Sequence, residues 1–286
     1  MSLPANELKT RLQKLRELLT LKNLSCGLIY YDELNIANGW YLSGWCPQFE
    51  SGAVLVPVQG EPVILGGPES EPFAQIDSAI KKTRNIPVFM VPEEEYPNAY
   101  ISSFAEVFKE IGMSEADRRV GIVGLEKMPL GVYQRLLAEL EGVELVDLTP
   151  EYENFRKLKS PWEIEQIKQA FAIADESIKV MEELVREGVF ETEIAGAGEG
   201  RSRSLGANWF AFKTIVASGI RSNGVVPTAS SGKSLQNGET LMVGISPRFN
   251  GYAGVAGGIF SLFYTFSGAG EKRGGSSVGG AVYIKK

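Results

Sequence analysis

The chain of 286 residues contains no histidine. Because imidazole is the commonest general base near neutral pH and the commonest metal ligand in proteins, Ser-His-Asp catalysis, Cys-His catalysis and His-ligated zinc are excluded within this sequence. Only two cysteines are present, Cys26 and Cys46, which are too few for a disulfide framework and lack metal-binding spacing. We therefore expect two inert, buried thiols in a reducing compartment. Any catalysis must run on carboxylates, Lys, Tyr, Ser or Cys.

Long apolar runs and basic runs are also absent. No stretch approaches the roughly 18 apolar residues that cross a bilayer, and charges interrupt residues 1–20, unlike a signal peptide. The net charge is -6, and no Lys/Arg run is suited to lining a groove for phosphates. The sequence thus favours a cytoplasmic protein with neither a membrane nor a nucleic acid as its partner.

The length is typical of two domains, and 44% hydrophobic residues suffice for a sizeable core. In the first half, helical periodicity is expected at residues 5–22, 69–82, 99–112 and 129–141, and short apolar strands at 27–31, 53–57, 62–65, 87–90, 120–123 and 143–148. Strands that alternate with helices of this length predict an α/β layer sandwich, which we assign to residues 1–152.

The second domain, residues 153–286, begins in a polar stretch at 149–159 that has no apolar periodicity. Ser160 and Glu163 form a capping-box pattern around Pro161, which is well placed at the first helical position. Apolar residues then recur every three or four positions, which predicts a helix over 161–187 that stops at Gly188.

Glycine is abundant in the rest of the second domain, since more than half of the 32 glycines lie after residue 195. Because glycine in an element interior costs about 0.5–1 kcal/mol relative to alanine, residues 195–200 are expected to form a poor helix. Strands are expected at 213–217, 239–246 and 259–266, and only 281–284 in the tail is able to pair as a strand.

Several motifs read together carry a family resemblance. They are Tyr41-Leu42-Ser43-Gly44-Trp45, residues 52–57 and 60–63, Arg156-Lys157-Leu158-Lys159-Ser160-Pro161-Trp162-Glu163-Ile164, Gly206-Ala207, residues 216–219 and Asn250-Gly251-Tyr252. In this order they resemble the creatinase, prolidase and X-Pro aminopeptidase family over nearly all of residues 5–265. The resemblance implies fold class α/β (α+β), with a creatinase-like N-terminal α/β domain followed by a partial pita-bread domain. It also implies a homodimer, because relatives build their site beside a neighbour's N-terminal domain.

The resemblance also implies where metals would bind. In the family's metallopeptidases an Asp on one strand and a second Asp eleven residues later bridge two divalent metals, which activate a water for attack on the peptide carbonyl. Eight residues before Tyr252 the first position is Gly244, and eleven further on the second is Val255. The usual Arg three residues beyond is Gly258. No metal and no other cofactor are therefore expected.

Creatinase keeps this scaffold without the metals and relies on a His about seventeen residues before the first position. That place is Pro227 here, the Glu beside the Arg corresponds to Gly257, and the substrate-gripping Arg of the N-terminal domain falls near Ser51. The sequence also ends well before a member of this family would, so the family's later His and two Glu ligands have no counterpart in it. The resemblance thus implies a retained frame without the chemistry of either mechanism.

Three residues are candidates for a substrate pocket: Phe212, Arg221 and Tyr252. An arginine there is able to clamp a carboxylate with two hydrogen bonds, and Phe212, with Trp209, is suited to an apolar wall. The competing interpretation is a surface Arg, a half-buried Tyr whose hydroxyl bonds a neighbour, and a Phe packed in the core.

Three hypotheses account for these features. The first is a hydrolase-like pseudoenzyme that binds small peptide or amide C–N compounds without metal and with little or no activity, or that serves as a dimerisation scaffold. The second is a metal-independent hydrolase of creatinase type, using Tyr252, Lys213 or Glu239 as the base. The third is a non-functional fragment of an X-Pro aminopeptidase. The losses at Gly244, Val255, Gly257 and Gly258 favour the first and third over the second.

Overall fold

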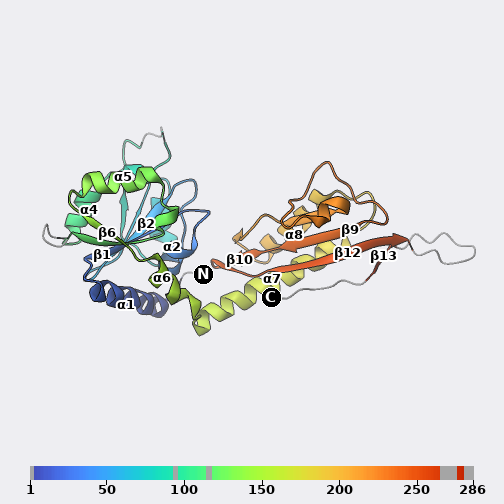
Figure 1. The fold of residues 1–286 in the computed structure, drawn as a ribbon, viewed down its shortest axis with the longest axis horizontal. Helices are drawn as coiled ribbons and strands as arrows, with labels where there is room; N and C mark the ends of the chain where they lie inside the picture. The colour runs from blue at the N-terminus through green and yellow to red at the C-terminus, as the bar shows by residue number, and fades with distance from the viewer. Residues whose placement is uncertain (1–2, 93–95, 114–117, 265–275, 280–286) are drawn as a thin grey trace, which may run out of the picture. The chain divides into compact units, whose positions relative to one another are not determined.

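The chain folds into two compact units, Met1–Leu158 and Lys159–Lys286, each with a hydrophobic core of its own (Figure 1). The computed structural model describes residues 3–92, 96–113, 118–264 and 276–279. Within those residues, no helix has the length and apolar character needed to cross a membrane.

A six-stranded mixed sheet forms the centre of the N-terminal unit, in the order β4-β3-β2-β1-β5-β6. Its strands are β1 Cys26–Tyr31, β2 Gly52–Pro57, β3 Val63–Gly66, β4 Thr83–Asn85, β5 Arg119–Val123 and β6 Glu144–Asp147. The central strand β1 runs antiparallel to β2 and parallel to β5. All six residues of β1 are buried, as expected for a strand covered on both faces.

Helices cover both faces of this sheet, so the predicted α/β layer sandwich is confirmed (Figure 1). The helices are α1 Ala5–Leu21, α2 Ala37–Ser43, α3 Glu71–Asp77, α4 Phe104–Glu110, α5 Leu130–Glu139 and α6 Thr149–Lys157. Leu28 and Tyr30 of β1 point into the core beneath α4 and α5, whereas Ile29 and Tyr31 point into the core beneath α1, α2 and α6. This is the alternation of a strand between two apolar layers.

One prediction for this unit is wrong for an identifiable reason. Residues 87–90 are not a strand, because Pro87–Phe89 form a 3₁₀ helix, η1; Pro87 has no N–H to donate to a ladder. The strand lies earlier, at β4, which pairs with β3. The boundary expected within 149–159 falls near its end, between Leu158 and Lys159, and it is preceded by helix α6. Its only buried residue is Tyr152, so no apolar period is visible.

The C-terminal unit pairs two helices with a four-stranded antiparallel sheet, in the order β13-β12-β9-β8 (Figure 1). The elements are α7 Pro161–Glu183, α8 Glu191–Ser204, β8 Ile215–Ser218, β9 Thr240–Ile245, β12 Ala256–Tyr264 and β13 Ser276–Gly279. A smaller sheet, β11-β10-β7, consists of β7 Trp209–Phe210, β10 Pro247–Phe249 and β11 Tyr252–Ala253. The strands predicted at 213–217 and 239–246 are confirmed with shifted ends, and the one predicted at 259–266 is confirmed with an earlier start; residues 265–266 and 281–284 lie outside the described residues.

The capping box of α7 is present as predicted. The Glu163 amide donates to Ser160 Oγ at 3.2 Å, and the Ser160 amide donates to Glu163 Oε2 at 2.8 Å. The helix ends at Glu183, four residues before the predicted end, and Gly188 follows in the turn with a φ of +84°. This left-handed backbone explains why a glycine stands there.

The expectation of a poor helix at 195–200 is wrong, because α8 runs through it. A Cβ at Gly198 would lie 2.5 Å from the Met181 Sδ atom of α7. Glycine therefore permits the close approach of the two helices. The packing gained offsets the propensity lost, as tertiary contacts commonly do.

Candidate functional site

The four-stranded sheet has one face turned away from α7 and α8, which we call the outer face. Leu241, Val243 and Ile245 of β9 belong to the core beneath the helices. Because side chains alternate along a strand, Met242 and Gly244 lie on the outer face. The cross-strand partners of these two residues share it: Ile215 and Ala217 on β8, and Gly257 and Ile259 on β12.

Gly244 is the position at which the family resemblance places the first metal-binding Asp. It pairs with Gly257 on β12 and with Ile215 on β8. A Cβ built on Gly244 would lie 3.6 Å from the Ile215 Cβ, which is an ordinary contact. The backbone there has room for a side chain, and the sequence supplies none.

The second position, Val255, is half-buried and directly precedes β12. Glycine has no side chain and the isopropyl group of valine has no donor atom, whereas divalent metals of this kind need carboxylate oxygens. Nowhere in the described part of the chain do three or more His, Cys, Asp or Glu side chains gather in a way that could hold a metal ion. The residues at these positions do not fit the metal pair that the resemblance implies.

Tyr252 is directed at the start of α7. Its hydroxyl donates to Glu163 Oε1 at 2.9 Å, and its ring packs edge-on against Trp162 with the centroids 5.8 Å apart. Beside it, the Asn250 side-chain amide donates to Gln166 Oε1 at 2.7 Å. Glu163 is only 3% exposed, so these bonds hold the β10–β11 turn against the helix in a nearly dry environment.

Gly254 allows the chain after β11 to approach α7 even more closely. A Cβ there would lie 2.2 Å from the Ala170 carbonyl carbon and 2.3 Å from the Phe171 nitrogen. The connection from β11 to β12 therefore lies directly on the backbone of α7. The hairpin that carries Gly244 and Val255 is fixed by this contact.

Arg221 is engaged with a buried carboxylate that the sequence did not single out. Glu191, the first residue of α8, is fully buried. Its Oε1 accepts from the Ser218 amide at 2.7 Å and from the Ser218 hydroxyl at 3.0 Å. Its Oε2 accepts from the Ser230 amide at 2.9 Å and from Arg221 Nε at 3.3 Å. The Arg221 Nη2 also donates to the Thr228 carbonyl, so the guanidinium closes the loop between β8 and β9.

Tyr252 and Arg221 lie toward opposite ends of the helix pair. Helix α8 runs antiparallel to α7, because Ser177 of α7 bonds Ser202 of α8 at 2.7 Å while Met181 meets Gly198. The first residues of α8 therefore lie beyond the last turn of α7, far from Glu163. The structure does not bring Arg221 and Tyr252 into one pocket.

Phe212 stands in the connection between β7 and β8 and is 39% exposed. The amide of the preceding Ala211 donates to the Ser246 carbonyl at 2.8 Å, which fixes this connection beside the end of β9. Phe212 is thus attached beside the end of β9, the strand that carries Gly244.

The alternative catalytic bases differ in availability. Burial raises the pKa of Glu239, but hydrogen bonds from Lys233 Nζ and the Gln236 amide outweigh burial and hold the pKa below its ordinary value. A carboxylate with a lowered pKa is a poorer general base. The Tyr252 hydroxyl already donates a hydrogen bond to Glu163, and Lys213 is exposed to solvent.

Sequence reasoning missed Glu191 because an acidic residue in the first turn of a helix is usually a solvated partner of the helix dipole. The sequence does place two acidic residues, Glu191 and Glu193, in the first turn of this helix, where one is enough to cap it. Glu193 makes the capping contact with the Phe190 amide at 2.7 Å, which leaves Glu191 for another role.

Comparison with known proteins identifies the family to which both units are similar. Residues 11–158 match the creatinase/prolidase N-terminal domain, and residues 165–268 match metallopeptidase family M24. An Xaa-Pro dipeptidase of Pyrococcus horikoshii is 28% identical over 217 residues, which is 75% of this chain and 54% of that protein. A creatinase of a Bacillus species is 29% identical over 189 residues, which is 63% of this chain and 44% of the relative.

Solved structures show the same fold. The X-Pro aminopeptidase of Thermotoga maritima aligns with a TM-score of 0.74 at 21% identity, covering 93% of this chain and 67% of that one. The prolidase of Pyrococcus horikoshii aligns with a TM-score of 0.72 at 22% identity, covering 89% and 65%. The chain spans about half the length of the curated relatives it matches. The expected fold class, an N-terminal α/β domain followed by part of a pita-bread domain, is confirmed, and the chain belongs to the creatinase and X-Pro peptidase family.

Proposed function

We propose that this chain is a metal-free pseudoenzyme of its family, which binds a small peptide or amide compound at the outer face and turns it over little or not at all. The observation that carries the proposal is the pair Gly244 and Gly257, flanked by Ile215. At the point where a carboxylate would hold a metal-bound water, two strands present bare backbone. A hydrolytic water then lacks the activation that a metal supplies.

The outer face still suits a ligand of this kind. Ile215, Met242 and Ile259 give it apolar side chains, and Ile259 is 46% exposed. Phe212 stands near one end of it and is also exposed. An apolar surface with a few polar backbone groups is the usual composition of small-molecule sites.

Calorimetry with X-Pro dipeptides and small amides tests the binding, and product analysis with Mn²⁺ or Co²⁺ added tests the turnover. We expect saturable binding without hydrolysis. Ile259→Asp should abolish binding, because it buries a carboxylate against the ligand. Ile220→Asp, at a residue that is 84% exposed in the 3₁₀ helix η3 Gly219–Asn223, is the matched control and should bind normally. Metal-dependent hydrolysis at rates typical of enzymes would refute the proposal.

The metal-independent hydrolase is the second candidate. It is disfavoured because the Tyr252 hydroxyl donates to Glu163 and the Glu239 carboxylate accepts from Lys233. If Tyr252→Phe, Lys213→Ala and Glu239→Ala all leave a measured rate unchanged, none of the three is its base. A fall of about 10²-fold or more in one of them, the size of a lost general base, would favour this candidate.

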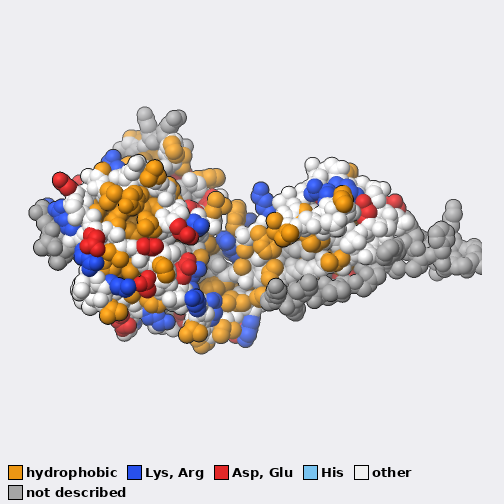
Figure 2. Space-filling view, viewed as in Figure 1, with side chains coloured by type: hydrophobic (Ala, Val, Ile, Leu, Met, Phe, Trp, Pro, Cys, Tyr) orange, Lys and Arg blue, Asp and Glu red, His pale blue; other side chains and the backbone are white. Residues whose placement is uncertain are grey.

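The proposal includes a homodimer in the cytoplasm. The homodimer rests on the family resemblance, and light scattering of the purified chain measures it. Neither Cys26 nor Cys46 is in a disulfide, which fits a reducing compartment. On the face seen in Figure 2, Lys and Arg side chains of the N-terminal unit are interspersed with Asp and Glu, which does not favour a polyanionic partner.

A further inference from the structure

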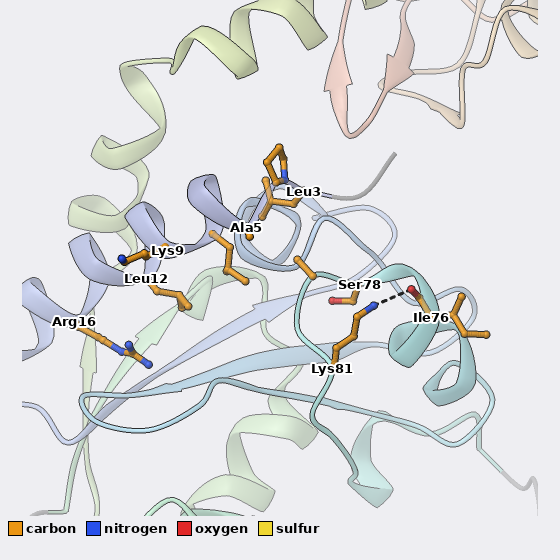
Figure 3. Close-up of a pocket in the computed structure, with 11 residues that line it drawn as sticks. Leu3, Ala5, Lys9, Leu12, Arg16, Ile76, Ser78 and Lys81 are labelled. Atoms are coloured by element: carbon orange, nitrogen blue, oxygen red, sulfur yellow. Dashed lines mark hydrogen bonds between the residues drawn. The ribbon is translucent and has the colours of Figure 1, made fainter.

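A groove in the N-terminal unit lies between α1 and the segment that follows α3 (Figure 3). Its volume is about 540 Å³, which is within the range of small-molecule sites. All of its lining residues belong to the first unit, so the groove is independent of the outer face and of the function proposed for it.

The floor of the groove is apolar. Leu8 and Leu12 come from α1, and Ala79 comes from the opposite side. Ile76 stands at the rim with 72% of its surface exposed, so its side chain is accessible to a ligand in the groove. The floor and rim together offer a continuous surface for an alkyl chain.

The charged residues that line the groove are all cations: Lys9, Arg16 and Lys81. Arg16 is held by the Pro57 and Gly60 carbonyls, and Lys81 Nζ donates to the Ile76 carbonyl at 2.8 Å (Figure 3). A lysine ammonium has three donors, so Lys81 retains two. Lys9 has no hydrogen-bond or ion-pair partner among the described residues.

The groove thus combines a positive rim with an apolar floor, although the net charge of the chain is -6. No acidic side chain lines the groove to neutralise the three cations. The complementary ligand has a negative head and an apolar tail, because a carboxylate forms charge-assisted hydrogen bonds with ammonium groups. We propose that this groove binds an alkyl monocarboxylate, with the chain along Leu8, Leu12 and Ile76 and the carboxylate at Lys81, on the opposite side of the groove from Lys9 (Figure 3).

Calorimetry of the full chain with decanoate, decanol and decylamine, each below its aggregation concentration, tests the ligand class. Decanoate should bind at one per chain, at least tenfold more tightly than decanol, and decylamine should bind least. Equal affinity for the three would overturn the proposal, because the cations would then contribute nothing. Absence of decanoate binding would overturn it as well.

Charge-reversal variants test whether decanoate binds in this groove. Lys81→Glu should weaken decanoate binding about tenfold or more, the size of one charge-assisted bond, and Lys9→Glu, across the groove, should weaken it less. Lys14→Glu, on the same helix but outside the groove, changes the net charge equally and should leave the affinity unchanged. Ile76→Asp should abolish binding, whereas Leu34→Asp, at a residue that is 89% exposed elsewhere, should not. Equal effects of Lys81→Glu and Lys14→Glu would show a general charge effect and overturn the assignment.

Discussion

Gly244 of β9 lies directly opposite Gly257 of β12, so two adjacent strands meet without a side chain on either. At Gly257 a Cβ would lie 2.9 Å from the Val243 carbonyl oxygen, whereas at Gly244 there is room for one. The absence of a carboxylate at Gly244 is therefore a property of the sequence and not a steric demand of the fold.

Gly254 and Gly196 are expected to respond oppositely to the same substitution. Gly254→Ala places a Cβ against the backbone of Ala170 and Phe171, and overpacking of this kind costs about 1–3 kcal/mol or more. Gly196→Ala in α8 meets nothing within 4 Å, so it should stabilise the chain by about 0.5–1 kcal/mol. Urea denaturation measures both. Equal effects of the two substitutions would contradict the packing described.

Glu191→Gln should destabilise the C-terminal unit by about 1.5–3 kcal/mol, the usual size for hydrogen bonds to a charged group. The carboxylate accepts from Ser218, Ser230 and Arg221, and an amide cannot accept all four bonds. Glu193→Gln on the same helix is exposed and keeps its capping contact, so its cost should be small. Hydrogen exchange should show faster opening of residues 219–230 only in Glu191→Gln. Unchanged hydrogen exchange at residues 219–230 in Glu191→Gln would show that Glu191 does not anchor this loop.

The ion pair of Glu239 with Lys233 predicts an acid-dependent loss of stability. Because the folded-state pKa of Glu239 lies below its ordinary value near 4.5, the pair stabilises the fold above that pH. This contribution is lost as the pH falls through the folded-state pKa. The difference in urea midpoint between the wild type and Glu239→Gln should therefore shrink from pH 7 to pH 3. A difference that stays constant over this range would show that the ion pair does not contribute.

The two thiols should differ in reactivity. Burial raises the pKa of Cys26 to about 12 and removes it from solvent, whereas Cys46 is only half-buried. Since the thiolate is the reactive form, native Cys46→Ser should show no thiol that reacts with Ellman's reagent at pH 8. In urea one thiol should react. Rapid reaction of the native variant would place Cys26 outside the core.

Much of the fold was predictable because apolar periodicity and helix caps are local signals. Ser160 and Glu163 marked the start of α7, and the buried runs of β1 and β2 marked the sheet. The features that escaped prediction depend on contacts distant in sequence. From the sequence, the glycines of α8 are expected to weaken a helix. Only the structure shows that Gly198 packs against Met181 of α7.

The candidate site was predictable in part. The spacing from Tyr252 identified Gly244 and Val255 once the resemblance was recognised. It could not show that Arg221 is bound to Glu191, or that the Tyr252 hydroxyl is bound to Glu163, because these partners are separated by 30 and 89 residues. Two plausible pocket residues thus belong to separate hydrogen-bond networks.

Metal content measures the proposed function most directly. The purified chain, incubated with Mn²⁺ or Co²⁺ and desalted, should retain far less than one ion per chain by elemental analysis. Gly244→Asp/Val255→Asp supplies two carboxylates and should retain more metal than the wild type, which shows that the assay detects binding at this hairpin. About two ions per wild-type chain, the content of a two-metal hydrolase, would contradict the proposal.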